Sequence, residues 1–118
     1  MDEKVMLAEA GTVVTTRKFV HGSRTVSLAG FRKVKVVEKR LGLSQYLEEA
    51  FLGRERVRVT VDLIGPARQV RCLAEVFSYK GPGKDRRSAY EADPRRLHVM
   101  RTASALARAV AISRWEVF

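Results

Sequence analysis

The sequence has very few of the residues that build covalent or metal-linked frameworks. Its 118 residues include one cysteine, Cys72, and two histidines, His21 and His98. A single cysteine forms no internal disulfide and no cysteine-rich metal cage, and neither histidine has acidic or cysteine neighbours at metal-ligand spacing. We therefore expect no cofactor and no metal.

Long apolar runs are also lacking. No stretch approaches the ~20 apolar residues that a membrane-spanning helix needs. The N-terminus, Met1-Asp2-Glu3-Lys4, starts acidic and lacks the basic-then-apolar pattern of a secretory signal. Apolar residues still make up 46% of the chain, which suits one domain with a modest core. The sequence thus predicts a single domain over residues 1–118, located in the cytoplasm and without a membrane partner.

Acidic residues are outnumbered by basic ones, 13 against 23, which gives a net charge of +10. Eight of the basic residues lie between Arg17 and Arg40, and Glu38 is the one acidic residue of that segment. Such a charge attracts nucleic acid first and an anionic membrane second. A compositional origin is the alternative. Arginine outnumbers lysine 16 to 7 and asparagine is absent, a bias that a GC-rich coding sequence or a heat-adapted protein also produces.

The first third of the chain has the β-branched density of strands. We predict one strand from Gly11 to Val20 and another from Arg24 to about Glu38, joined by a turn at residues 21–23. Gly30 lies inside the second strand, where a bulge or bend is expected. Residues 1–10 are short and mixed, and we interpret them as a loose N-terminal arm.

A short helix is predicted after Leu43. Ser44 can cap its first turn, and Gly53 is well placed to end it. Between them, Leu47, Ala50 and Phe51 form an apolar stripe at helical spacing.

The central stretch, Arg54 to Lys80, predicts a β-hairpin with its turn at Gly65-Pro66. Both arms alternate with a period of two, so each has two faces. We expect the aliphatic face to point inward and the other face to carry arginines and aromatic rings. The inward set is Val57, Val59, Val61, Leu63, Val70, Cys72, Ala74 and Val76, and the outward set includes Arg56, Arg58, Arg71, Leu73, Glu75, Phe77 and Tyr79.

The remaining residues predict a loop and a helix. Residues 81–92 begin with two glycines and a proline and contain several basic residues, which is typical of a flexible basic loop. Asp93-Pro94 is a helix start, with Asp as N-cap and Pro at the first helical position. The helix should continue to about Ser113, and Trp115–Phe118 could form a short last strand.

These elements define an α+β fold in the order ββαββα. We expect a four- to five-stranded antiparallel sheet with two helices on one face. A ferredoxin-like variant, with Trp115–Phe118 as its last strand, is the alternative. Both arrangements leave one face of the sheet without helices.

That free face is the predicted nucleic-acid site. Lysine and arginine side chains contact phosphates, and aromatic rings stack on unpaired bases. Proteins that bind single-stranded nucleic acid on a sheet surface use both kinds of contact. We therefore predict a nucleic-acid-binding protein without sequence specificity that favours single-stranded or structured DNA or RNA. The predicted site consists of Phe31, Lys33, Lys35, Arg56, Arg58, Arg71, Phe77 and Tyr79 on the sheet, with Lys84, Arg86 and Arg87 from the loop.

Two other functions fit parts of the pattern. Leu73, Phe77 and Tyr79, or the alanine-rich C-terminal helix, could instead form an interface in a homo-oligomer or larger assembly. Asp62 and Glu75, on paired strands, could hold a metal in a nuclease, although no catalytic motif is recognisable. We therefore expect that the protein is not an enzyme.

Overall fold

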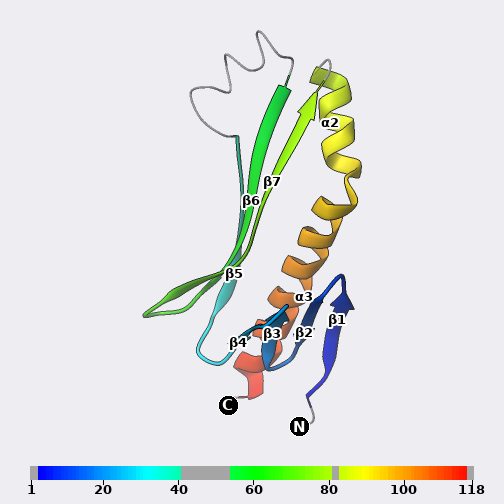
Figure 1. The fold of residues 1–118 in the computed structure, drawn as a ribbon. Coiled ribbons are helices and arrows are strands. Elements are labelled where there is room, and N and C mark those ends of the chain that lie inside the picture. The colour runs from blue at the N-terminus through cyan, green and yellow to red at the C-terminus, as the bar shows by residue number, and fades with distance from the viewer. Residues whose placement is uncertain (1–2, 41–53, 81–82, 117–118) are drawn as a thin grey trace.

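The computed structural model describes residues 3–40, 54–80 and 83–116 (Figure 1). Within these ranges it contains a four-stranded antiparallel sheet, a three-stranded antiparallel sheet and two helices that follow all the strands. The molecule is elongated, with extents of 55 × 28 × 24 Å. The elements are β1 (Val5–Glu9), β2 (Thr12–Thr15), β3 (Lys18–His21), β4 (Arg24–Ser27), β5 (Lys33–Arg40), β6 (Arg54–Ile64), β7 (Gln69–Lys80), α2 (Gly83–Ala92) and α3 (Pro94–Glu116).

The predicted fold class is wrong in its order and its sheet. The structure does not follow the order ββαββα, because α2 and α3 come after the last strand and the strands divide into two sheets. The ferredoxin-like variant fails for the same reason. Trp115 and Glu116, the described residues of its proposed last strand, belong to α3. The helix predicted between Ser44 and Gly53 lies outside the described residues.

The four-stranded sheet is a simple meander, β1-β2-β3-β4. The predicted loose arm contains β1, which pairs with β2. The predicted strand from Gly11 to Val20 is two strands, β2 and β3. Thr15 causes the break, because its hydroxyl accepts the backbone N–H groups of Arg17 and Lys18 at 3.1 and 3.0 Å. A side chain that binds the backbone locally in this way competes with the ladder and turns the chain.

The connection between the two sheets lies at Gly30. The predicted continuous strand stops at Ser27 and restarts at Lys33, and Gly30 between them has a φ of +84°, which a residue with a Cβ rarely adopts. Gly65, in the β6–β7 turn, packs against this connection. A Cβ on Gly65 would lie 2.9 Å from the carbonyl oxygen of Gly30, so a side chain there would displace backbone.

The three-stranded sheet contains the predicted hairpin, but with an irregular register. Val61 pairs with Leu73, whereas Asp62 pairs with Arg71, so Cys72 is an extra residue in β7. A bulge of one residue exchanges the two faces of the strand beyond it. Leu73 and Phe77 therefore point to the same side as Val57 and Val61, and all four are buried. The predicted inward positions of Ala74 and Val76 are wrong, and both are exposed.

The helices form one nearly continuous rod that bends at Asp93 (Figure 1). The predicted cap is confirmed, because Asp93 Oδ1 accepts the backbone N–H of Arg95 at 2.9 Å. The segment predicted as a loop contains α2. Its glycines and proline stand at residues 81–83, and the sequence after Gly83 consists largely of residues that tolerate a helix well. Asp85 also lies in the first turn of α2, where a negative charge is favourable.

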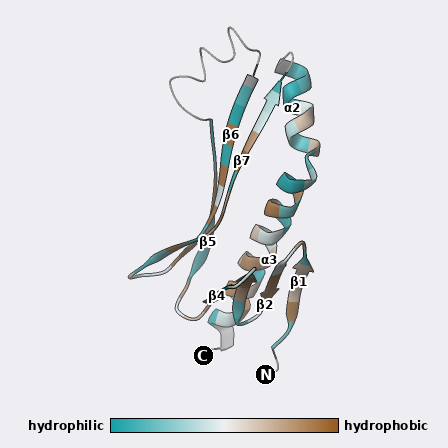
Figure 2. Cartoon of the chain, viewed as in Figure 1, coloured by the Kyte–Doolittle hydropathy of each residue, from teal (hydrophilic) through white to brown (hydrophobic). Residues whose placement is uncertain are grey.

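The core lies where α3 meets both sheets. Figure 2 shows apolar residues concentrated on the short strands and on the part of α3 beside them, while the far end of the three-stranded sheet is largely hydrophilic. α3 contacts β1, β2, β5 and β6, so it joins the two sheets into one cluster. The fully buried side chains of this cluster include Val14, Phe19, Leu28, Val59, Leu63, Phe77, Val99 and Leu106.

Candidate nucleic-acid interface

The three-stranded sheet has one face toward α3 and one face away from it, which we call the outer face. Two contacts identify the face toward α3. The Arg95 guanidinium lies over the Phe77 ring at 4.9 Å, and the Tyr79 hydroxyl donates to Asp93 at 2.6 Å. Every second residue along each strand therefore points away from α3. The described residues of the outer face are Lys33, Lys35, Val37, Lys39, Arg56, Arg58, Thr60, Asp62, Ile64, Gln69, Arg71, Ala74, Val76, Ser78 and Lys80.

Basic side chains dominate this face. Of its described residues, seven are lysine or arginine and one, Asp62, is acidic. Asp62 is 3% exposed, and it accepts from Gln69 Nε2 at 2.9 Å and from Arg71 Nε at 3.2 Å. Its charge is thus compensated by Arg71 within the sheet, and the remaining basic groups stay in excess.

Four of these basic residues, Lys35, Lys39, Arg58 and Arg71, line a shallow hollow of about 190 Å³. Lys35, Lys39 and Arg58 are exposed, and none of them forms an ion pair with a described residue. Lys39 and Arg58 lie directly opposite each other, as do Lys35 and Asp62. Two neighbouring strands therefore bring these positive charges together over the centre of the outer face.

The structure divides the predicted site residues into three groups. Lys33, Lys35, Arg58 and Arg71 lie on the outer face and are exposed, and Arg56 lies there half-buried. The aromatic residues form the second group, and the residues of α2 form the third.

The aromatic residues do not belong to this face. Phe77 is fully buried and Tyr79 is half-buried on the side toward α3, because the bulge at Cys72 reverses their orientation. Phe31 is 2% exposed, and the guanidinium of Arg68 covers its ring at 4.4 Å. Phe31 and Phe77 are therefore not accessible for stacking on bases, and Tyr79 lies on the opposite side of the sheet from the outer face.

The basic residues of α2 lie on the other side of the sheet. α2 contacts β7 and α3, and Tyr90 packs edge-on against Phe77 on the face opposite to the outer face. Arg86 lies 3.6 Å from Glu55, whereas Lys84 and Arg87 are exposed. One surface therefore cannot contain both the sheet residues and the α2 residues of the predicted site.

Sequence reasoning missed Lys39 and Gln69 as members of the outer face. The signal for Lys39 was present, because residues 33, 35, 37 and 39 fall on one side of a regular strand. The signal for Gln69 was also present, because Gln69 and Arg71 fall on one side of β7 between the turn and the bulge at Cys72.

Asp62 and Glu75 lie on opposite faces of the three-stranded sheet. Glu75 pairs with Val59, which points toward α3, whereas Asp62 points away from it. They therefore cannot hold one metal ion together. Among the described residues, no group of three or more histidines, cysteines or carboxylates is arranged to bind a metal. Cys72 is buried, and this burial raises the pKa of its thiol to about 11, which disfavours the reactive thiolate.

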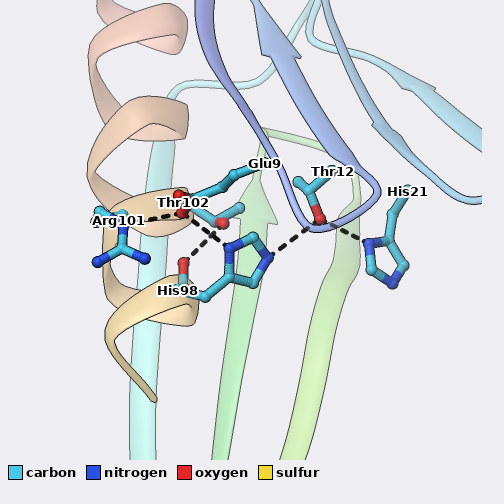
Figure 3. A network of polar contacts seen from close by, with 6 residues as sticks. All are labelled: Glu9, Thr12, His21, His98, Arg101 and Thr102. Carbon is cyan, nitrogen blue, oxygen red and sulfur yellow. Dashed lines mark hydrogen bonds and ion pairs between the residues drawn. The ribbon is translucent and has the colours of Figure 1, made fainter. Parts of the chain in front are cut away.

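A second polar cluster joins the four-stranded sheet to α3 (Figure 3). The carboxylate of Glu9 accepts from Arg101 Nε at 2.8 Å and from His98 Nδ1 at 2.9 Å. Hydrogen bonds from Arg101 and then from His98 lower the pKa of Glu9. The other ring nitrogen of His98 lies 3.2 Å from the hydroxyl of Thr12, which lies 2.7 Å from His21 Nδ1.

The carboxylate at one end sets the direction of these hydrogen bonds. Glu9 can only accept, so a neutral His98 has its proton on Nδ1 and accepts from the Thr12 hydroxyl at Nε2. The hydroxyl oxygen of Thr12 then accepts from His21 Nδ1. Thr12 is 1% exposed, so no substrate reaches its hydroxyl, and the cluster acts as a polar clamp between β1, β2, β3 and α3.

Comparison with protein-family models, curated proteins and solved structures gives no match to this chain. None of the helices in the described ranges is long and apolar enough to cross a membrane.

Proposed function

We propose that this protein binds the phosphate backbone of nucleic acid, without base-sequence specificity, through the outer face of the three-stranded sheet. One observation carries the proposal: Lys35, Lys39 and Arg58 meet over a shallow hollow without a described ion-pair partner. Grouped cations that no carboxylate neutralises attract a polyanion and gain free energy when its counterions are released.

The chemistry of this face favours phosphates over bases. Its described residues include no aromatic ring, so it offers no platform for stacking. Same-face side chains on a strand are roughly 6.6 Å apart, which allows lysines of β5 to contact successive groups along a backbone. The expected preference for single strands depended on stacking, so the proposal does not include it. Duplex DNA has the higher charge per length and should bind at least as tightly as a single strand.

Fluorescence anisotropy with labelled duplex and single-stranded oligonucleotides tests this proposal. The triple variant Lys35→Gln/Lys39→Gln/Arg58→Gln should weaken binding by about tenfold or more at low salt, equivalent to about 1.4 kcal/mol. The control Lys4→Gln/Lys18→Gln/Arg108→Gln removes the same charge from exposed positions on the four-stranded sheet side and on α3. Equal loss of affinity in both variants would show that net charge, rather than this face, determines binding.

For the alternative role as an assembly subunit, the interface expected on the sheet is not exposed. Leu73 and Phe77 are 6% and 0% exposed within a single chain, so they are not accessible to a partner in this conformation. The molar mass in solution, measured by light scattering at several concentrations, tests whether a second copy binds through another surface.

A further inference from the structure

A pocket of about 850 Å³ lies on the opposite side of the three-stranded sheet from the outer face. Residues of β5, β6 and β7 line one side of it, residues of α2 line the other, and Arg96 in the first turn of α3 completes the described lining. Its volume falls within the range of small-molecule sites, roughly 300–1,000 Å³. We call it the α2 pocket.

Two carboxylates organise the arginines of this pocket. Glu55, with its side chain 15% exposed, lies 2.9 Å from Arg40 Nε and 3.6 Å from Arg86 Nε. Glu38 accepts from Arg96 Nη2 at 3.4 Å and from the Tyr90 hydroxyl at 2.5 Å. Each carboxylate therefore fixes side chains from two walls.

Tyr90 remains a hydrogen-bond donor in this arrangement. Its burial and its hydrogen bond to Glu38 raise the pKa of the phenol to about 12, so it is protonated at neutral pH. The guanidinium of Arg96 also lies over the Tyr90 ring at 4.8 Å. Arg96 therefore occupies one face of this ring, and charge is the main means by which the pocket can recognise a ligand.

The pocket has more positive than negative groups. Among the described residues that line it, five are basic and three are acidic, a surplus of two positive charges. Lys84 and Arg87, one turn apart on α2, form no ion pair with a described residue. In addition, Arg96 Nε is buried and has no hydrogen-bond acceptor among the described residues.

We propose that the α2 pocket binds a small molecule that carries a phosphate monoester. A phosphate monoester has a charge of about −1.5 to −2 at pH 7, which matches the surplus of two positive charges, and it offers three strong acceptor oxygens. The space beyond one phosphate group accommodates the organic part of such a molecule. This function is separate from the outer face, because the sheet lies between the two sites.

Isothermal titration calorimetry with three probes tests the proposal: AMP, adenosine and inorganic phosphate. We expect AMP to bind and adenosine to bind at least about a hundredfold more weakly, since it lacks the anionic group. Binding of inorganic phosphate as tightly as AMP would contradict a phosphate monoester as the ligand, because the organic part would then contribute nothing to binding. The absence of heat with AMP and with inorganic phosphate at millimolar concentration would overturn the proposal.

Two matched variants assign the binding to the pocket. Lys84→Gln/Arg87→Gln alters exposed side chains of α2 and should weaken AMP binding about tenfold or more, while duplex binding by the outer face is retained. Lys35→Gln/Lys39→Gln should give the reverse pattern. Unchanged AMP affinity in the α2 variant, or equal loss in both variants, would contradict a site in the α2 pocket. Circular dichroism and the melting temperature of each variant confirm that it is folded.

Discussion

Phe77 lies directly opposite Val57 in the β6–β7 ladder, and both side chains point toward α3. This pairing exists because Cys72 is an extra residue in β7. If the register set at the turn continued without the bulge, Phe77 would lie on the outer face, opposite Arg56. The bulge thus moves an aromatic ring from the surface into the core and leaves the outer face to lysine and arginine.

The first prediction concerns the role of Phe77. Phe77→Ala should lower the free energy of unfolding by about 3–5 kcal/mol, because it removes a fully buried ring and leaves a cavity. Val76→Ala, at a position that is 49% exposed on the outer face, should change it by less than about 0.5 kcal/mol. Urea denaturation measures both. A stable Phe77→Ala variant that no longer binds single strands would instead place the ring at the binding surface.

The second prediction concerns Asp62, the acidic residue of the outer face. Asp62→Asn removes a buried negative charge that Arg71 and Gln69 contact. It should lower the free energy of unfolding by about 1–3 kcal/mol, because Arg71 and Gln69 then lose the carboxylate that accepts their hydrogen bonds. It should also tighten duplex binding roughly threefold, because the outer face gains one positive charge and the exposed guanidinium of Arg71 can contact phosphate. Weaker duplex binding by a folded Asp62→Asn variant would argue against the outer face as the binding site.

The third prediction concerns the clamp between Thr12 and the two histidines. Thr12→Val keeps the shape of the side chain but removes the hydroxyl that links His98 to His21, and it should cost about 1–3 kcal/mol of stability. Thr12→Ser should restore most of the loss. Nitrogen NMR of the imidazole rings at pH 8 should show His98 with its proton on Nδ1. A proton on Nε2 of neutral His98 would contradict the proposed direction of the hydrogen bonds.

The fourth prediction concerns acid stability. Burial alone would raise the pKa of Asp93, but hydrogen bonds from Tyr79 and Arg95 outweigh it and lower the pKa. Hydrogen bonds from Arg101 and His98 lower the pKa of Glu9 in the same way. A carboxylate with a lowered pKa in the fold stabilises the protein above its unfolded pKa, near 4, and this contribution is lost as the pH falls through the folded value.

The melting temperature between pH 7 and pH 2.5 checks this sign. It should fall below about pH 4 in the wild type, and the fall should be smaller in Glu9→Gln/Asp93→Asn, which lacks both carboxylates. An equal fall in both proteins would assign the acid sensitivity to other groups.

Local signals in the sequence predicted the elements better than their arrangement. The β6–β7 hairpin, the turn at residues 21–23 and the helix start at Asp93 each depend on neighbouring residues, and the structure has all three. The bulge at Cys72 has no local signature, because Cys72 fits the alternation of its strand. The break at Thr15 was equally hidden, since it depends on a hydroxyl that binds the backbone rather than on a glycine or proline.

The sequence predicted most of the basic residues that the candidate site contains, but it did not predict which side of the sheet each predicted residue lies on. The lysines of β5 fall on one face by alternation alone, so Lys33 and Lys35 were found correctly on one side of the sheet. The position of α2 could not be derived, because it depends on the packing of Tyr90 against Phe77 and Tyr79. Consequently Lys84, Arg86 and Arg87 belong to the opposite side of the sheet, beside the α2 pocket.

The salt dependence of duplex binding tests the central claim most directly. The slope of log Kobs against log salt concentration reports how many phosphate contacts are made, at about 0.9 per contact on duplex DNA. If Lys35, Lys39 and Arg58 contact phosphates, the slope of their triple glutamine variant should be smaller by about 2–3 than that of the wild type. A slope equal to that of the wild type would show that the outer face is not the nucleic-acid interface.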